Sequence, residues 1–179
     1  MKTFRISLCS LFTSLLFAAA SQAASPFNGK DLDDWKTKPQ GKNTDRWSVG
    51  VAEVHPERPN ELIVKEGAGE MINTPSKANG KSLDIYSTFT HGDARIELEI
   101  MVPKGSNSGI YLHGEYEIQV LDSYGRTKLG MGDMGAIYGA KPPAMNACKK
   151  PGEWQKYEIL FHAPKYKDGK KVKNAFIDK

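Results

Sequence analysis

The sequence predicts an all-β fold, an antiparallel β-sandwich or barrel. Extended segments are short and lie between turn residues, and within them hydrophobic and polar residues alternate with the period of two that a strand requires. No convincing 3.6-residue helical period follows Phe27. The composition, 39% hydrophobic and 26% charged, is that of an ordinary globular protein. Because no repeat or linker interrupts it, we expect a single domain over residues 24–179.

The expected strands follow one another closely along the chain. Residues 95–102 alternate most clearly, with Ile96, Leu98 and Ile100 on one face. Other strands are expected at residues 61–65, 83–90, 108–113, 116–121, 135–138, 157–161 and 172–177. Lysines flank the Asp168-Gly169 turn, which predicts an exposed hairpin tip. We expect all three tryptophans, Trp35, Trp47 and Trp154, to pack in the core.

The first 23 residues predict a signal peptide. A basic start is followed by the apolar residues 6–20 and then by Ser21-Gln22-Ala23, the small-residue pattern of a cleavage site. The apolar run is too short to cross a bilayer, which takes about 20 residues. We therefore expect a periplasmic or secreted protein that leaves the membrane after cleavage. Loss of the leader lowers the formal net charge from +4 to +2, so no nucleic-acid partner is expected.

Cys148 is the single cysteine left after cleavage, so the sequence predicts no internal disulfide and a buried, hydrophobic role for this side chain. Asp31, Asp33 and Asp34 form an acidic cluster without the glycine and final glutamate of an EF-hand loop. We interpret that cluster as a turn. Asp122 is interpreted as a carboxylate that caps the turn after residues 116–121.

Residues 115–121 carry the most informative alternation. Tyr116, Ile118 and Val120 share one face, and Glu115, Glu117 and Gln119 share the other. Three polar side chains in a row are costly inside a core, so the second face must line water or a ligand groove. A plain solvated sheet face, with acids beside the lysines of a neighbouring strand, is the alternative.

The preceding segment extends this face. Tyr111 and His113 point the same way, and Gly114 predicts a tight hairpin in which Tyr111 lies opposite Glu117. Glu99, with Glu97 beside it, is expected to add a carboxylate to the same face. Acids, an imidazole, an amide and phenols together can bind sugar hydroxyls and carry out acid–base chemistry.

Two further residues have two interpretations each. Asn107 is either a turn residue satisfied by its own backbone or a group that faces the groove. Tyr138 either presents its ring to a sugar or packs in the core.

Several long strings resemble the family named for 3-keto-disaccharide hydrolases, once a domain of unknown function, whose fold is similar to concanavalin A-like lectins and glucanases (jelly roll). The resemblance covers the mature chain. The strings are Phe27-Asn28-Gly29-Lys30-Asp31-Leu32 with Trp35, Asn107-Ser108-Gly109-Ile110-Tyr111-Leu112, Tyr116-Glu117-Ile118-Gln119-Val120-Leu121-Asp122-Ser123, Gly135-Ala136-Ile137-Tyr138-Gly139, Lys150-Pro151-Gly152-Glu153-Trp154-Gln155 and Ala163-Pro164. Members of that family continue with further closing strands, so we expect this chain to be truncated at its C-terminus.

The resemblance implies an exported enzyme that cleaves 3-keto-glycosides by base-initiated elimination and hydration. Glu117 is then the candidate base, and His113 or a bound divalent cation would stabilise the enolate oxygen. The expected substrate-binding residues are Glu99, Asn107, Tyr111, Glu115, Gln119 and Tyr138. No cofactor is certain; a divalent metal ion is the one considered.

Two other functions remain open at this point. One is a non-catalytic, lectin-like carbohydrate-binding module. The other is a conventional retaining glycosidase, because Glu115-x-Glu117-x-Gln119 is similar to the Glu-x-Asp-x-Glu strand of laminarinase-like enzymes. Gln119 stands where that pattern places its acid, which weakens this second function.

Overall fold

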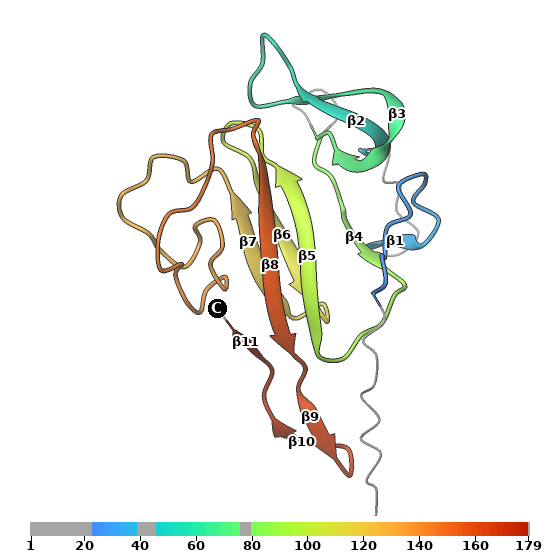
Figure 1. Cartoon of the computed structure of the whole chain (residues 1–179), viewed down its shortest axis with the longest axis vertical. Coiled ribbons are helices and arrows are strands. Elements are labelled where there is room, and N and C mark those ends of the chain that lie inside the picture. Colours follow the sequence, from blue (N-terminus) through green and yellow to red (C-terminus); the bar gives the residue numbers. More distant parts are fainter. Residues whose placement is uncertain (1–22, 39–45, 76–79, 179) are drawn as a thin grey trace, which may run out of the picture.

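The computed structural model describes residues 23–38, 46–75 and 80–178. Every regular element in these ranges is a strand, and every pairing is antiparallel (Figure 1). The strands are β1 (Trp35–Lys38), β2 (Trp47–Val54), β3 (Leu62–Asn73), β4 (Asp84–Ser87), β5 (Ala94–Met101), β6 (Asn107–Leu112), β7 (Tyr116–Leu121), β8 (Trp154–His162), β9 (Lys165–Lys167), β10 (Lys170–Lys173) and β11 (Phe176–Asp178).

Two sheets form the sandwich that positions the site. One has the strand order β11–β8–β5, and the other is the hairpin β6–β7. Their inner faces meet in a hydrophobic core that joins Leu112 and Ile118 of the hairpin to Ile159 and Phe161 of β8. The all-β antiparallel sandwich predicted from the sequence is confirmed.

The alternation expected on β5 and β7 is also confirmed. Ile96 and Leu98 of β5 pack against the core, and Ile118 and Val120 of β7 are buried in it. A shift of one residue in either strand would have exchanged the two faces, so the hydrophobic pattern fixes the register here.

The N-terminal part of the chain forms two smaller ladders. β1 pairs with β4, and β2 pairs with β3 through a register shift after Gly50. β1 and β2 were not predicted, and β3 is much longer than residues 61–65. Glycines interrupt the alternation in the second half of β3, where Gly67 and Gly69 adopt positive φ, so the periodic signal ends early.

The C-terminal strands form an arm that projects from β8 (Figure 1). β9 and β10 pair around Asp168 and Gly169, both with positive φ, as the predicted lysine-flanked hairpin requires. β11 then returns to pair with β8.

Three sequence predictions need correction or completion. Trp154 lies outside the core, 39% exposed, because it begins β8 on the outward side of the alternation. Residues 135–138 form an isolated bridge to β7 through Ile137 rather than a strand. The predicted signal peptide falls almost wholly outside the described residues, among which no helix is long and apolar enough to cross a membrane.

Two smaller predictions are confirmed. Asp122 caps turns, since its carboxylate accepts the N–H groups of Gly105 (2.8 Å) and Tyr124 (3.3 Å). The Asp31 segment is a turn, closed by hydrogen bonds to the side chain of Asn28. Cys148, expected to be buried, is only half-buried; its thiol is not in a disulfide, and burial raises its pKa.

Candidate functional site

On the outer face of the β6–β7 hairpin, a tyrosine phenol is hydrogen-bonded to a glutamate carboxylate. Tyr111 pairs directly with Glu117 in the ladder, as predicted, and Tyr111 Oη donates a 2.7 Å hydrogen bond to Glu117 Oε2. This hydrogen bond, with burial second, raises the pKa of Tyr111 to about 12. The phenol therefore stays protonated at any physiological pH and holds one carboxylate oxygen in place.

Glu117 rests on a glycine. A β-carbon at Gly109 would stand 2.8 Å from the carboxyl carbon of Glu117 and closer still to Oε1, so only glycine leaves room for the carboxylate there. Tyr111 engages Oε2, and Oε1 has no hydrogen-bond partner among the described residues. Glu117 is partly exposed.

Gln119 and Asn107 lie beside the Tyr111–Glu117 pair on the same face of the hairpin. The Nε2 group of Gln119 donates to Asn107 Oδ1 and to the carbonyl of Gly132, each at 3.1 Å. Gln119 is only 2% exposed, and its Oε1 is buried without a hydrogen-bond partner among the described residues. Asn107 is exposed.

The prediction that Gln119 faces an open groove is therefore wrong. The segment around Gly132 and Ala136 crosses over it, and its backbone exchanges hydrogen bonds with that segment. Gln119 can act on a ligand only through Asn107. The side chain of Asn107 binds Gln119 rather than its own turn, which contradicts the first of the two interpretations given above.

Tyr138 reaches the site from the long connection between β7 and β8. Its backbone N–H donates to the carbonyl of Glu117 at 3.0 Å, and its side chain is 56% exposed. Its phenol is close enough to Tyr111 to contribute to the raised pKa of that residue. Two exposed tyrosines thus accompany Glu117.

A buried acid, which the sequence analysis did not single out, anchors this connection. Asp133 Oδ1 accepts from Ser123 Oγ (2.9 Å) and Arg126 Nη1 (2.7 Å), and Oδ2 accepts from the N–H of Gly130 (2.7 Å). These bonds, the backbone one first, lower the pKa of Asp133. The signal available in the sequence was an aspartate among glycines, Gly130-Met131-Gly132-Asp133, where short turns leave backbone N–H groups to be satisfied.

His113 does not join this cluster. It occupies the β6–β7 turn with a positive φ, its Nε2 lies 2.9 Å from the carbonyl of His91, and its ring packs on Phe161. The turn directs its side chain to the end of the core, away from the face that holds Tyr111. Glu115 lies in the same turn region; burial, and second a hydrogen bond to Glu115, raises the pKa of the Tyr116 phenol.

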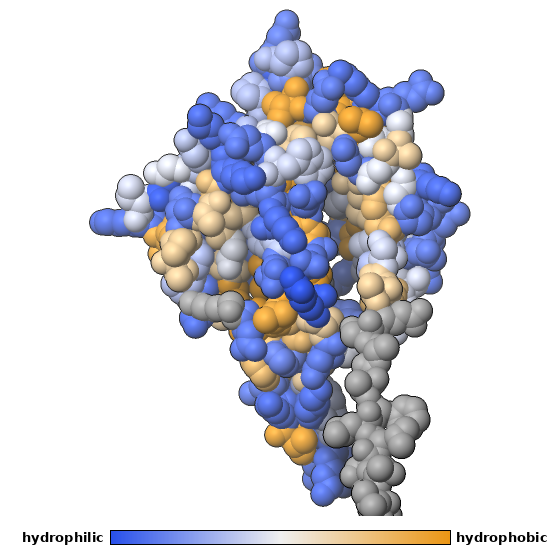
Figure 2. All heavy atoms as spheres, in the orientation of Figure 1, coloured by the Kyte–Doolittle hydropathy of each residue, from blue (hydrophilic) through white to orange (hydrophobic). Residues whose placement is uncertain are grey.

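Glu99 lies on the far side of the sandwich. The inner face of β5 packs on the core, so its outer residues point away from β6–β7. Glu97, which is on the same face of β5 as Glu99, forms ion pairs with Lys156 at 2.8 Å and with Arg95 at 3.2 Å. Figure 2 shows hydrophilic side chains along this front face over β5 and β8. The prediction that Glu99 joins the carboxylate of Glu117 is wrong, and the outer face of β5 is a solvated ladder of charged side chains.

The residues for a divalent metal ion are not assembled in the part of the chain that is described. Within residues 23–38, 46–75 and 80–178, no group of three or more His, Cys, Asp or Glu side chains is placed to hold one. We therefore derive no step through a metal.

Comparison with known proteins identifies the family. Residues 22–177 match the domain described as 3-keto-alpha-glucoside-1,2-lyase-like. The chain belongs to this family. Curated proteins give no match.

A solved structure supports the fold of this 3-keto-alpha-glucoside-1,2-lyase-like domain. It is a crystal structure from Parabacteroides distasonis ATCC 8503, provisionally described as a glycosyl hydrolase, with 32% identity and a TM-score of 0.62. The similarity covers 88% of this chain and 60% of that one.

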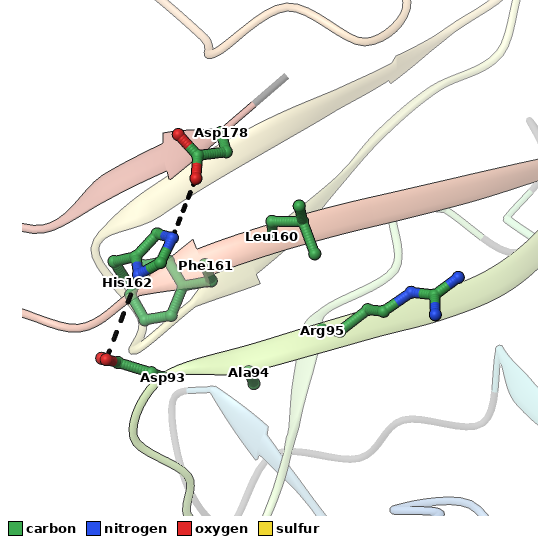
Figure 3. A pocket seen from close by; sticks show the side chains of 7 residues that line it. All are labelled: Asp93, Ala94, Arg95, Leu160, Phe161, His162 and Asp178. Atoms are coloured by element: carbon green, nitrogen blue, oxygen red, sulfur yellow. Dashed lines mark hydrogen bonds and ion pairs between the residues drawn. The ribbon is translucent and has the colours of Figure 1, made fainter.

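A separate pocket of about 360 Å³ lies at the end of the β5–β8–β11 sheet of the 3-keto-alpha-glucoside-1,2-lyase-like domain (Figure 3). His162 stands between two acids there, with Nε2 3.0 Å from Asp178 and Nδ1 4.0 Å from Asp93. Asp93 also accepts from Lys165 at 2.7 Å, which lowers its pKa, and Phe176 stacks on His162. These groups tie β9 and β11 to the sheet, so we assign the pocket a structural role.

Proposed function

We propose that this chain is a carbohydrate-active enzyme that cleaves 3-keto-glycosides by base-initiated elimination followed by hydration. The observation that carries the proposal is the arrangement of Glu117, whose carboxylate has one oxygen fixed by Tyr111 and the other without a hydrogen-bond partner among the described residues. Membership of the 3-keto-alpha-glucoside-1,2-lyase-like family supports the substrate class, and the glycosyl hydrolase description of the structural relative supports action on carbohydrate.

The proposed elimination requires one carboxylate as the base rather than a pair of carboxylates. A ketone at C3 acidifies the hydrogen on C2. Glu117 removes that proton, and the C2–H electron pair forms a C2–C3 double bond while the carbonyl electrons move to O3. When C3=O re-forms, a C1–C2 double bond forms and the bond from C1 to the aglycone oxygen breaks.

In this proposal Tyr138 completes the proton transfers, which its exposed phenol supports. Its exposed phenol donates a proton to the departing alkoxide. Water then adds to C1 and returns a proton to Tyr138, and Glu117 returns its proton to C2. The net reaction consumes one water and yields a 3-keto-sugar and an alcohol, with both residues restored.

Tyr111 has a different part in this scheme. Because the pKa of its phenol is raised to about 12, it does not titrate during the cycle. It donates to Glu117 Oε2 throughout and directs proton abstraction to Oε1. It is a positioning residue.

The test compares Glu117→Gln with the unchanged protein. Each is incubated with a 3-keto-glucoside and with the parent glucoside, and aglycone release is followed. We expect release from the keto-sugar alone and a loss of at least ~100-fold in Glu117→Gln, the scale of a general base. Glu66→Gln, a change of an exposed glutamate on β3, is the matched control and should retain activity.

Other outcomes point to the other functions. Binding of the keto-sugar without release by the unchanged protein would favour the lectin-like module. Release from the parent glucoside would favour a conventional glycosidase. Unchanged folding of Glu117→Gln is checked by its thermal unfolding midpoint, so that lost activity is not confused with lost structure.

We also propose export, with cleavage after Ala23. The support is the order of basic, apolar and small residues at the start of the sequence. Intact-mass analysis of protein from the periplasm or medium should give a chain that begins at Ala24. A mass that retains residues 1–23 would contradict the proposal.

A further inference from the structure

We infer that the side-chain amide of Asn107 binds the C3 oxygen of the keto-sugar and stabilises the negative charge that develops there. The inference rests on the proposed function and names a further catalytic residue for it. Proton abstraction at C2 moves an electron pair onto O3, so the site needs a donor at that oxygen. His113, the candidate suggested by the sequence, is engaged with the carbonyl of His91 and packed on Phe161.

The spacing of residues along β6 places Asn107 close to the Glu117 carboxylate. Asn107, Gly109 and Tyr111 follow one another on the outer face, and alternate residues of a strand are roughly 6.7 Å apart. The Glu117 carboxylate lies over Gly109, with Oε2 bound to Tyr111. The carboxylate therefore lies between Asn107 and Tyr111 along β6, and Asn107 is two residues from the glycine beneath it.

That separation fits the reacting atoms of the substrate. The abstracted proton and O3 belong to adjacent carbons. A contact of about 3 Å from the base to C2, about 2.4 Å between C2 and O3, and a hydrogen bond of about 2.9 Å to O3 reach about 8 Å in a straight line and roughly 7 Å when bent. One sugar edge can reach Glu117 Oε1 and the Asn107 amide at the same time.

Gln119 determines which end of the Asn107 amide faces the substrate. An asparagine side chain can present either its oxygen or its nitrogen, and the two have opposite effects on an enolate. Gln119 Nε2 donates to Asn107 Oδ1, so the oxygen is held and the Nδ2 group is left as a donor. No hydrogen bond among the described residues occupies Asn107 Nδ2.

The cost of this arrangement supports a functional reason for it. With both N–H groups of Gln119 used on Asn107 and Gly132, its Oε1 remains buried and unpaired. An unmade buried hydrogen bond is unfavourable. An apolar side chain could fill the same space under the loop but could not orient Asn107.

The decisive variant is Asn107→Asp. Aspartate still accepts the hydrogen bond from Gln119, so the fold keeps its contact, but it has no N–H group to donate and presents a negative oxygen to the enolate. Asn60→Asp, at an exposed turn, is the matched control. Two rates are measured for each protein: aglycone release from a 3-keto-glucoside, as kcat and KM, and exchange of the C2 hydrogen of 3-ketoglucose with deuterated water by NMR.

We expect Asn107→Asp to lower kcat by about 100-fold or more, the usual loss for one oxyanion donor, with KM within about three-fold. The C2 exchange rate should fall by a similar factor, because 3-ketoglucose enolises without losing an aglycone. Asn60→Asp should match the unchanged protein in both rates.

Two results would overturn the inference in distinguishable ways. If the unchanged protein releases aglycone and Asn107→Asp raises KM but leaves kcat and exchange intact, Asn107 binds a hydroxyl and the proposed function stands. If the unchanged protein neither cleaves the keto-glycoside nor exchanges C2, the proposed function fails and the role of Asn107 fails with it.

Discussion

Tyr111 and Glu117 are direct cross-strand partners, and the phenol of one donates a 2.7 Å hydrogen bond to the carboxylate of the other. Cross-strand partners on one face have β-carbons about 5 Å apart, so the ladder itself brings the two functional groups within reach. The tight turn at His113 and Gly114 sets this register.

The Tyr111–Glu117 hydrogen bond predicts a change in tyrosine titration. Glu117→Gln removes the carboxylate whose hydrogen bond and charge raise the pKa of Tyr111 to about 12, while burial remains. The pKa should therefore fall toward the ordinary value of about 10. Absorbance at 295 nm during an alkaline titration measures it, and Tyr111→Phe identifies which transition belongs to Tyr111. Identical curves for the unchanged protein and Glu117→Gln would contradict the bond.

Gly109→Ala should lower activity with little loss of stability. The new methyl group would displace the Glu117 carboxylate, whose position over Gly109 leaves no room for it. We expect a fall in kcat of at least ~10-fold, consistent with a misplaced catalytic group. Gly109 has no positive φ, so alanine adds no backbone strain there.

Gly92→Ala is the matched control for this change. Gly92 also lacks a positive φ, and a methyl group added to it would meet no atom within 4 Å beyond its chain neighbours. Urea unfolding of both variants should stay within about 1 kcal/mol of the unchanged protein. Full activity in Gly109→Ala would show that the Glu117 carboxylate does not need its position over Gly109.

Asp133 should make the stability of the protein depend on acid pH. Its pKa is lower in the folded than in the unfolded chain, so its stabilisation is complete above the unfolded value of about 3.9 and is lost as pH falls through the folded value. Asp133→Asn should lose about 2 kcal/mol at pH 7, since it cannot accept all three hydrogen bonds. Urea unfolding from pH 7 to pH 2.5 should show the two proteins converging as the pH falls. A constant difference would contradict this role.

Asp93→Asn should loosen the β9–β10 arm. The change removes the ion pair to Lys165 at the base of the arm, an exposed pair that solvent screens and that acts locally. Trypsin should then cut within residues 165–173 about two- to five-fold faster, with an unchanged global unfolding midpoint. Asp33→Asn, at an exposed turn, is the control. Equal cleavage rates in all three proteins would show that Asp93 does not hold the arm.

The sequence was sufficient to predict the core of the sandwich and the Tyr111–Glu117 pair. Both depend on period-two alternation and on the short turn of residues 113–115, and these act over short stretches of chain. β5, β7 and the lysine-flanked hairpin were predicted for the same reason.

Long-range placement was not predictable in the same way. Glu99 has the same alternation as Glu117, but which side of the sandwich a strand occupies is decided by tertiary packing and not by its own pattern. The burial of Gln119 was missed because the covering segment, around Gly132 and Ala136, has no periodicity and is held by hydrogen bonds to Asp133 and to β7.

The site residues come from two kinds of structure. Glu117, Tyr111 and Asn107 stand on paired strands, whereas Tyr138 stands on a connection anchored at Asp133. Under the proposed function, the outer part of this connection meets the leaving alcohol. Its residues can therefore be exchanged, with the anchor at Asp133 kept, to change which alcohol the protein accepts while the strand residues that act on the sugar stay the same.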